Sequence, residues 1–262
     1  MIHYSKETFL EYYRNYTRRI DGRKADQYRE IAIKHDVIKT AEGSAIARLG
    51  DTLVVAGIKI EYGDLFEDNK GNFIVNIDLS PIAHESFVSG PPDERGIELS
   101  RIVDRGFRSA EVLNLGKLAL EAKKGYTVFL DMYVIDYDGN AVDASYLAGM
   151  AALSNIRIPK IENDKLNRNE FVQDNFLQNH VISSTFAKID DIIILDPTHM
   201  ESELADVLVS IAVDRDDNIV GIQKMGNGGL NRDELDEMIE IALKNRPKIL
   251  NRILGEKDVK DK

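Results

Sequence analysis

Helical spacing of apolar residues after Ser5 predicts a short N-terminal helix with that serine as its cap. Its apolar positions are Phe9, Leu10, Tyr12 and Tyr13. The polar turn at 21–24 ends this helix, and residues 28–62 then alternate in the manner of strands. A Gly-Asp pair at 50–51 predicts a hairpin turn within that stretch, and residues 73–79 predict a further strand.

The middle of the chain predicts a helix, a strand and a second helix. Residues 91–93 (Pro-Pro-Asp) open a helix over roughly 94–112, whose apolar stripe is Leu99, Ile102, Val103, Gly106 and Ala110. Residues 126–135 predict a strongly apolar strand, and the turn at 138–140 leads into a helix rich in small residues. Those residues are Ala141, Ala144, Ala148, Gly149, Ala151 and Ala152. Because small side chains allow close packing on a sheet, we expect this second helix to be buried.

The last third of the chain returns to strands before it ends in a helix. Residues 160–180 are polar and predict an insertion or an exposed hairpin. Short apolar runs predict three strands, at 192–195, 207–213 and 219–224. Asn231 with Glu234 predicts a capping box for a final amphipathic helix. Its apolar positions are Leu235, Met238, Ile239 and Leu243. The charged tail after Leu254 is expected to be frayed.

This order of elements predicts sheets and helices packed in layers, of α+β or α/β type, instead of a regular doubly wound sheet. The chain has 262 residues, of which 43% are hydrophobic, enough for one large domain or two fused small ones. No apolar run reaches the ~18 residues that a membrane span requires, and no signal-peptide pattern opens the chain. We therefore expect a cytoplasmic protein without a membrane partner.

Charge and cysteine content narrow the function classes. The chain contains no cysteine, which excludes disulfides and thiolate metal sites. The formal net charge is −11, which argues against a general nucleic-acid coat but leaves room for a local basic patch.

Several short segments carry a resemblance to a known family. They are Asp21-Gly22-Arg23-Lys24-Ala25-Asp26, Gly43-Ser44-Ala45, Leu49-Gly50-Asp51-Thr52, Glu94-Arg95-Gly96-Ile97-Glu98-Leu99-Ser100-Arg101 and Ala205-Asp206-Val207. Together they resemble RNase PH-family proteins over nearly the whole chain. The segments 91–94 and 103–105 look most like the non-catalytic ring subunits of archaeal exosomes. The resemblance implies an α+β, RNase PH-like (ribosomal protein S5 domain 2-like) fold. We expect one such domain over 1–262, with a short N-terminal helix and a charged tail.

The family's reaction is phosphorolysis, in which phosphate attacks the last phosphodiester of an RNA 3′ end. It needs an anion cradle and an acidic group near the scissile bond, often with Mg²⁺. In active relatives the cradle is a Gly-Ser-Arg turn at a helix N-terminus. Here the matching turn, 139–141, reads Gly-Asn-Ala, and Asp138 adds negative charge beside it. We expect Asp138 or Asn140 to cap the helix instead.

Active relatives also carry two aspartates six residues apart. Aligning Asp206 with the family's last aspartate puts these positions at Ile194 and Met200, which cannot act as acid, base or metal ligand. Asp196 lies nearby, but the position six residues after it is Ser202. The resemblance therefore implies a subunit without catalytic residues, cofactor or metal.

Arginines on the helix predicted over 94–112 are the candidate RNA contacts. Arg101, Arg105 and Arg108 fall within about 60° of one helix face, opposite the apolar stripe, and Arg95 stands near the helix start. They would bind RNA phosphates. The alternative is a solvated face in which these side chains pair with Glu98, Asp104 and Glu111.

Two further patterns have simpler explanations. His199, Glu201, Glu203 and Asp206 suggest a metal site, although a polar loop entering a strand also accounts for them. The glycine-rich segment 226–229 resembles a phosphate loop but lacks the P-loop lysine, so we interpret it as a strand-to-helix turn.

The resemblance implies an alternating hexameric ring with a catalytic RNase PH-like exosome subunit, together with RNA-binding cap subunits and RNA as partners. Two other functions stay open on the sequence. One is an active phosphorolytic 3′–5′ exoribonuclease of RNase PH type. The other is an unrelated small-molecule enzyme that uses Glu201, Glu203 and Asp206.

Overall fold

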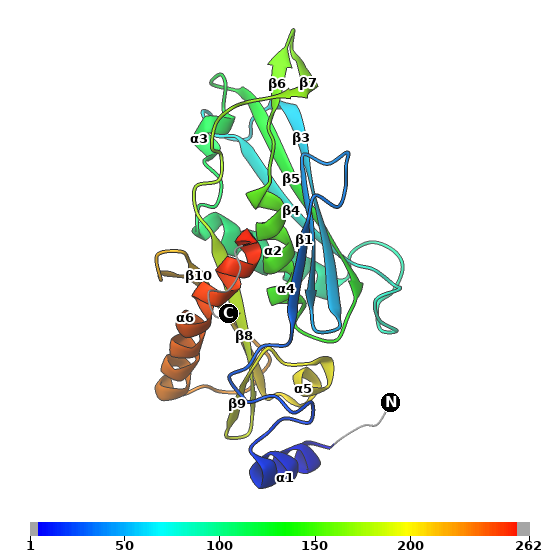
Figure 1. Ribbon diagram of the computed structural model, residues 1–262, viewed down its shortest axis with the longest axis vertical. Helices are drawn as coiled ribbons and strands as arrows, with labels where there is room; N and C mark the ends of the chain where they lie inside the picture. Colours follow the sequence, from blue (N-terminus) through cyan, green and yellow to red (C-terminus); the bar gives the residue numbers. More distant parts are fainter. Residues whose placement is uncertain (1–4, 256–262) are drawn as a thin grey trace, which may run out of the picture.

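The computed structural model describes residues 5–255, and in this part the chain forms two main sheets with helices packed between and around them (Figure 1). The first sheet has the order β1-β2-β3-β5-β4. Its strands are β1 (Ile31–His35), β2 (Gly43–Leu49), β3 (Thr52–Asp64), β4 (Asn72–Leu79) and β5 (Lys124–Asp136). All neighbours are antiparallel except β4 and β5, which run parallel and are connected through α2.

The second sheet has the order β11-β10-β8-β9 and is antiparallel throughout. Its strands are β8 (Val181–Ile189), β9 (Ile192–Leu195), β10 (Val207–Asp214) and β11 (Ile219–Met225). The helices are α1 (Lys6–Tyr16), α2 (Glu94–Ser109), α3 (Leu115–Leu118), α4 (Ala141–Ser154), α5 (His199–Leu204) and α6 (Arg232–Leu254).

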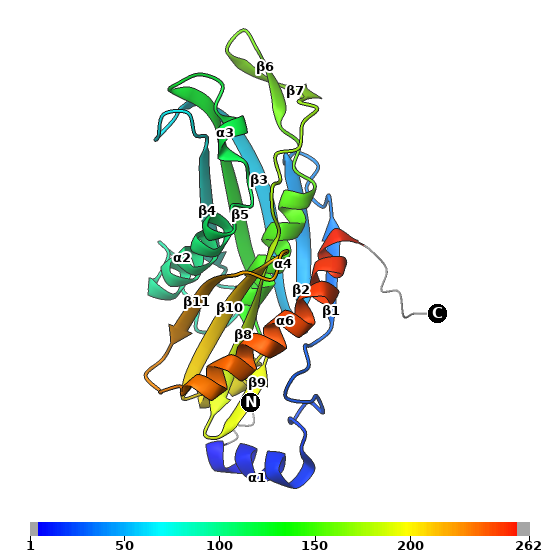
Figure 2. The same ribbon diagram turned by 90° about the vertical axis from the view of Figure 1, so that its left-hand side faces the viewer.

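Helix α4 lies between the two sheets and contacts β2 and β3 on one side and β8 on the other (Figure 2). Every residue from Ala141 to Leu153 is buried, as its small side chains predict. Helix α2 packs on β4 and reaches β11, and α6 packs on β8 and β10. The main core runs from the first sheet through α4 to Val181, Ile182 and Ala212 of the second sheet. The prediction of layered sheets and helices is confirmed.

Local signals predicted several element ends correctly. Ser5 caps α1 by accepting from the backbone N–H of Thr8. The predicted hairpin joins β2 and β3, with Leu49 paired to Thr52 across the Gly50–Asp51 turn. Asn231 and Glu234 form the predicted capping box of α6.

The second sheet contains a strand that the sequence pattern did not predict. Strand β8 carries Ser183, Ser184 and Thr185 at its centre, which interrupts its apolar run, yet it is buried on both faces. Two of its hydroxyl groups bond inside the protein: the side-chain oxygens of Thr185 and Ser210 lie 2.8 Å apart, and Ser184 accepts from the Tyr28 hydroxyl. The hydroxyl of Ser183 has no hydrogen-bond partner within residues 5–255. Internal hydrogen bonds allow Ser184 and Thr185 to occupy a core strand.

Residues 160–180 contain the predicted exposed hairpin, formed by β6 (Pro159–Glu162) and β7 (Lys165–Phe171), which projects at the upper end of Figure 1. The prediction of a polar loop around 199–206 is wrong, because residues 199–204 form α5. Thr198 and Glu201 close a capping box at its start. The tail predicted to be frayed lies, from residue 256 onward, outside the described residues. Among the residues that the structure describes, no helix has the length and apolarity that a bilayer crossing requires.

Candidate functional site

The turn before α4 is where the resemblance places the phosphate cradle. Asn140 adopts the left-handed conformation at φ 54° and caps α4, since its Oδ1 accepts from the backbone N–H of Asp143. Its Nδ2 donates to Asp143 at 2.9 Å and to Asp196 at 2.7 Å. Gly139 has φ 82°, and a Cβ there would lie 2.4 Å from the backbone nitrogen of His199. The turn therefore packs directly against the start of α5, and of the two caps that the sequence predicted, Asp138 or Asn140, the helix uses Asn140.

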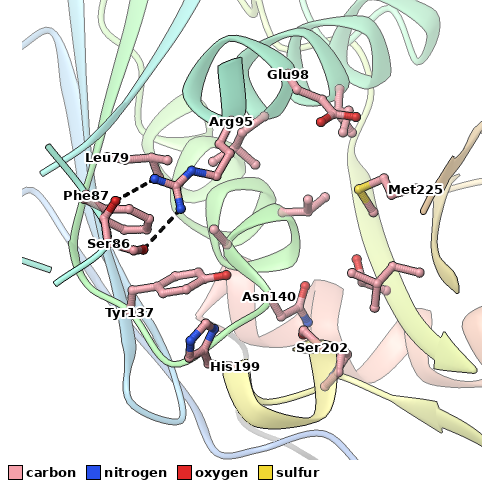
Figure 3. A pocket seen from close by; sticks show the side chains of 17 residues that line it. Leu79, Ser86, Phe87, Arg95, Glu98, Tyr137, Asn140, His199, Ser202 and Met225 are labelled. Carbon is pink, nitrogen blue, oxygen red and sulfur yellow. Dashed lines mark hydrogen bonds between the residues drawn. The ribbon is translucent and has the colours of Figure 1, made fainter. Parts of the chain in front are cut away.

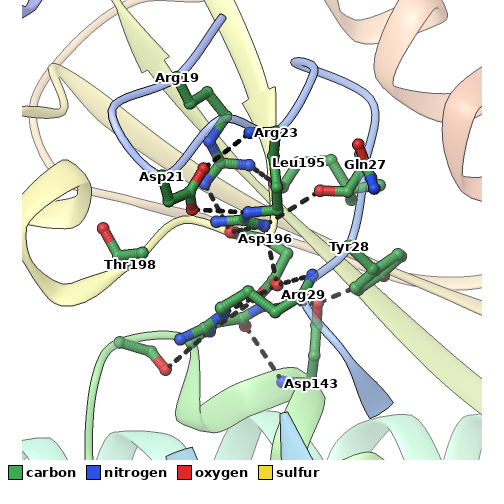
Figure 4. A network of polar contacts seen from close by, with 12 residues as sticks. Arg19, Asp21, Arg23, Gln27, Tyr28, Arg29, Asp143, Leu195, Asp196 and Thr198 are labelled. Atoms are coloured by element: carbon green, nitrogen blue, oxygen red, sulfur yellow. Dashed lines mark hydrogen bonds and ion pairs between the residues drawn. The ribbon is translucent and has the colours of Figure 1, made fainter. Parts of the chain in front are cut away.

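Asp196 is fully buried beside this turn (Figure 4). Its Oδ1 accepts from Nη2 of Arg29 at 2.8 Å and from Asn140. Its Oδ2 accepts from the backbone N–H and Nε of Arg29, both at 2.9 Å, and from Nη1 of Arg23 at 3.2 Å. Both carboxylate oxygens are thus occupied by protein donors, as a buried charge requires.

A further ion pair and several bonds to backbone carbonyl groups extend this cluster into the N-terminal segment. Arg19, which is fully buried, donates through Nε to Oε1 of Glu201 at 2.8 Å and through Nη2 to Oε2. Arg19 also donates to the carbonyl oxygens of Leu195 and Asp196 at 2.6 and 2.8 Å. Arg29 donates to the carbonyl oxygen of Asp138 at 2.6 Å. We call Arg19, Arg23, Arg29, Asp196 and Glu201 the buried ionic cluster.

The electrostatics at the α4 N-terminus are set by carboxyl groups. Burial raises the pKa of Asp143 to about 6, although hydrogen bonds from Asn140 and Thr185 oppose the rise. Burial also raises the pKa of Asp138. Asp143 and Asp196 lie against the positive end of the helix, and their negative charge weakens the attraction of this turn for an anion.

The structure corrects the alignment of the aspartate positions. Ile194 is buried in the core beneath α1, together with Phe9. The residues that meet the α4 turn and the neighbouring cavity are Asp196 and Ser202, two positions later than the ungapped alignment placed them. The pair is still incomplete, because Ser202 stands at its second position and donates its hydroxyl to the Thr198 carbonyl.

A cavity of about 280 Å³ opens between α2, the α4 turn and β11 (Figure 3). Its apolar lining includes Leu79, Phe87, Leu99, Ile102, Ala141, Val142, Pro197, Leu208 and Met225. Its polar lining is Ser86, Arg95, Glu98, Tyr137, Asn140, Thr185, His199 and Ser202. We call this space the α2 cavity.

The four predicted arginines fall into two kinds. Arg95 pairs with Asp93 at 3.0 Å, donates to the Ser86 carbonyl at 2.6 Å and lies over the Phe87 ring. Arg108 pairs with Asp104 at 2.8 Å and donates to the carbonyl oxygen of Phe73. These two side chains match the ion-paired alternative.

Arg101 and Arg105 differ from the other two. Both are exposed, and within residues 5–255 neither has a hydrogen bond or ion pair. They border a shallow groove between α2 and β11, opposite Gln223. Their guanidinium groups are therefore available to a ligand in this groove.

The side chains of the predicted metal cluster do not converge. Glu201 belongs to the buried ionic cluster, and Asp206 pairs with Lys6 at 2.6 Å. His199 and Glu203 are neighbours at 3.5 Å along α5. Each carboxylate thus has a different partner, and the described residues contain no group of three or more histidine or acidic residues placed to hold a metal ion.

Sequence reasoning missed the buried ionic cluster. The sequence patterns place Arg23 in a polar turn and in a family segment without giving it a role, and they do not single out Arg19 and Arg29. Their partners lie 167 to 182 residues further along the chain. The available signal was the presence of three arginines close together in the segment 19–29.

Comparison with known proteins places these features in a family. Residues 27–159 match the model of the 3′ exoribonuclease family, domain 1, and residues 179–245 match that of domain 2. "Exosome complex component Rrp42" of Saccharolobus islandicus is 44% identical over 239 residues, covering 88% of this chain and 86% of that protein. The protein of the same name from Saccharolobus solfataricus is 42% identical over 242 residues, covering 90% and 88%.

Solved structures agree with this similarity. A chain of the "archaeoglobus fulgidus exosome with RNA bound to the active site" has a TM-score of 0.86 and 37% identity, covering 94% of this chain and 96% of that one. A chain of the "Archaeal exosome core" has a TM-score of 0.84 and 34% identity, covering 95% and 96%.

Proposed function

Because this chain belongs to the 3′ exoribonuclease (RNase PH) family, we propose that it is the non-catalytic ring subunit of an archaeal exosome. In this role it structures an active RNase PH-like partner, alternates with it in a hexameric ring, and contributes RNA contacts to 3′-to-5′ phosphorolysis. The similarity to exosome chains over 94% or more of the sequence supports this role.

The non-catalytic assignment depends on the turn before α4, where the polar groups of Asn140 and Asp196 are already hydrogen-bonded to the protein. Phosphorolysis needs donors for the attacking phosphate and a free acidic group at the scissile bond. At this turn Asn140 donates to two carboxylates, and Asp196 accepts from two arginines and the asparagine. The arginine of the cradle is replaced by Ala141.

These residues do not fit the Mg²⁺ that active relatives often use. A Mg²⁺ site requires carboxylate oxygens with open coordination, and both oxygens of Asp196 are occupied by cationic and amide donors. Ser202 supplies a hydroxyl where a second carboxylate would stand.

The RNA contacts are assigned to the outer face of α2. Arg101 and Arg105 have no protein partner within the described residues and border the same groove. Arg95 and Arg108 flank them, but their guanidinium groups are already held by the protein, so their share of RNA binding is smaller. RNA and RNA-binding cap subunits are the partners that this role requires.

Two assignments of this proposal remain predictions. One is a cytoplasmic location for the ring. The other is a single RNase PH-like domain over 1–262, which the continuous core between the two sheets supports.

Reconstitution with the catalytic RNase PH-like subunit of the same organism tests the proposal. The pure chain should release no nucleoside diphosphate from RNA in the presence of phosphate, whereas the mixture should sediment as a heteromer and release it. Omitting phosphate from the mixture is the control and should stop the release. Robust release by the pure chain, or a chain that stays monomeric beside its partner, would contradict the proposal.

A further inference from the structure

The α2 cavity has the dimensions and lining of a small-ligand pocket. Its volume of about 280 Å³ lies near the small end of such pockets, which begin at about 300 Å³. One wall is aromatic, with ring centroids 5.1 Å apart between Phe87 and Tyr137 and 5.5 Å apart between Tyr137 and His199. Arg95 lies over Phe87 and keeps that ring in place. The cavity therefore offers a preformed apolar and aromatic slot.

Two polar groups of this cavity are unused by the protein. The hydroxyl of Tyr137 points into the cavity in Figure 3 and has no hydrogen-bond partner within residues 5–255. The carboxylate of Glu98, on α2, likewise has no partner in that part of the chain. By contrast, Asn140 and Thr185 bond to Asp143 and have little capacity left. A ligand would thus meet the free carboxylate of Glu98 and the free hydroxyl of Tyr137, whereas Arg95 and Ser202 in the same lining already bond within the protein.

This combination selects the chemistry of the ligand. The inside of the cavity disfavours a phosphate group, because the amide of Asn140 is already used by Asp143 and Asp196 and the carboxylate of Glu98 repels an anion. A flat heterocycle that carries N–H donors suits the aromatic wall and the acceptor Glu98. The volume equals about nine waters at ~30 Å³ each, which matches the roughly ten non-hydrogen atoms of a purine.

The cavity continues into the arginine groove. Glu98 and Ile102 line both spaces, and Arg101 and Arg105 stand on the outer side of that boundary. A nucleotide placed here would keep its phosphate in water beside the arginines while its base enters the cavity. The two sites are therefore arranged for one ligand with an anionic backbone and a planar base.

We propose that the α2 cavity binds a nucleobase with amino donors, with guanine favoured because it presents adjacent N–H donors to the single carboxylate of Glu98. The base comes either from RNA lying on Arg101 and Arg105 or from a free nucleotide. The RNA source rests on the proposed function, whereas the cavity itself does not.

Calorimetric titration of the full chain and of the assembled ring tests this inference. The probes are GMP, UMP and ribose 5-phosphate. GMP should bind more tightly than UMP, and ribose 5-phosphate should not bind measurably. Glu98→Gln should weaken GMP binding about tenfold, the usual cost of losing a hydrogen bond to a charged group. Glu61→Gln, which changes an exposed carboxylate on β3 that lines neither the cavity nor the groove, is the matched control and should bind GMP normally.

A second variant blocks the cavity without relying on Glu98. Met225→Trp on β11 should fill the space and abolish GMP binding, whereas Ile219→Trp on the same strand should not. Thermal melting of both variants checks that they fold. Equal binding of GMP and ribose 5-phosphate, or GMP affinity unchanged by both Glu98→Gln and Met225→Trp in folded protein, would overturn the inference.

Short oligonucleotides separate the two sources of the base. If Glu98→Gln weakens a guanine-containing pentamer more than a uridine pentamer on the ring, the cavity takes a base from RNA. If it weakens only GMP, the cavity is a mononucleotide site. If the ring does not assemble, or if replacing Arg101 and Arg105 does not change RNA affinity, the proposed function is contradicted. The result of the GMP titration is independent of both outcomes.

Discussion

Replacing Arg101 and Arg105 together with alanine should weaken RNA binding by the assembled ring. Both side chains are exposed and without a protein partner in the described part of the chain, so their removal breaks no internal bond. They are one helical turn apart, a rise of about 6 Å, and face the same groove. Alanine is a better helix former than arginine, so α2 should persist and ring assembly should be nearly unchanged.

The size of the effect follows from counterion release. Each phosphate contact on a single strand adds about 0.7 to the magnitude of the slope of log affinity against log salt concentration. Losing two contacts should lower that magnitude by about 1.4 and weaken binding about 25-fold at 0.1 M salt. The same relation predicts that the difference shrinks towards zero as the salt concentration approaches 1 M.

Fluorescence anisotropy with a labelled oligonucleotide at several salt concentrations measures both quantities on intact rings. Arg108→Ala should change RNA affinity little, since Arg108 is held by Asp104 and the Phe73 carbonyl. Arg14→Ala with Arg232→Ala removes the same charge from α1 and α6 and controls for net charge. An unchanged affinity and slope in the Arg101 and Arg105 variant would refute the assignment and make this a solvated face.

Three further predictions concern stability. Burial raises the pKa of Asp143 from 3.8 to about 6. Between about pH 4 and 6 the folded chain therefore keeps a proton on Asp143 that the unfolded chain releases. The contribution of Asp143 to the free energy of unfolding should fall by about 3 kcal/mol as the pH rises through that window. Urea unfolding at several pH values should show a smaller fall for Asp143→Asn, and parallel pH profiles would contradict this. Gly106→Ala should lower the free energy of unfolding in urea by about 1–3 kcal/mol, because the new Cβ would lie 1.6 Å from the Tyr146 hydroxyl. A gain in stability, as expected for a glycine on an exposed helix face, would contradict this packing. Asp196→Ala should lower the free energy of unfolding by about 3–5 kcal/mol, because it leaves the buried Arg29 without its main partner. A loss below about 1 kcal/mol would show that Asp138 and water replace the carboxylate of Asp196.

Much of the fold could be predicted because local signals and burial agree. Ser5 and Asn231 mark helix starts through capping hydrogen bonds that involve neighbours only three residues away. The small side chains of the segment 141–152 predicted a buried helix without knowledge of its surroundings. By contrast, β8 was missed because residues 183–185 are polar in sequence, and the partners that let Ser184 and Thr185 lie in the core, Tyr28 and Ser210, come from distant segments.

The candidate site was predictable only in part for the same reason. Helical geometry grouped Arg101, Arg105 and Arg108 on one face, but it could not show that Asp104 and the Phe73 carbonyl hold Arg108. The loss of the cradle arginine was visible in the sequence at 139–141. The occupation of Asp196 by arginines was not, because ion pairs between distant segments leave no periodic signal.

The buried ionic cluster also orders events during synthesis. Arg19 and Glu201 are 182 residues apart, so at about 5–20 residues per second the ribosome makes the arginine about 9–36 s before its carboxylate partner. Until then Arg19, Arg23 and Arg29 must stay in water, because burying them without acceptors would be costly. The segment 17–30 therefore reaches its final packing only after the chain has been made to Glu201, and a translation product that stops before Asp196 lacks both carboxylates that hold these arginines.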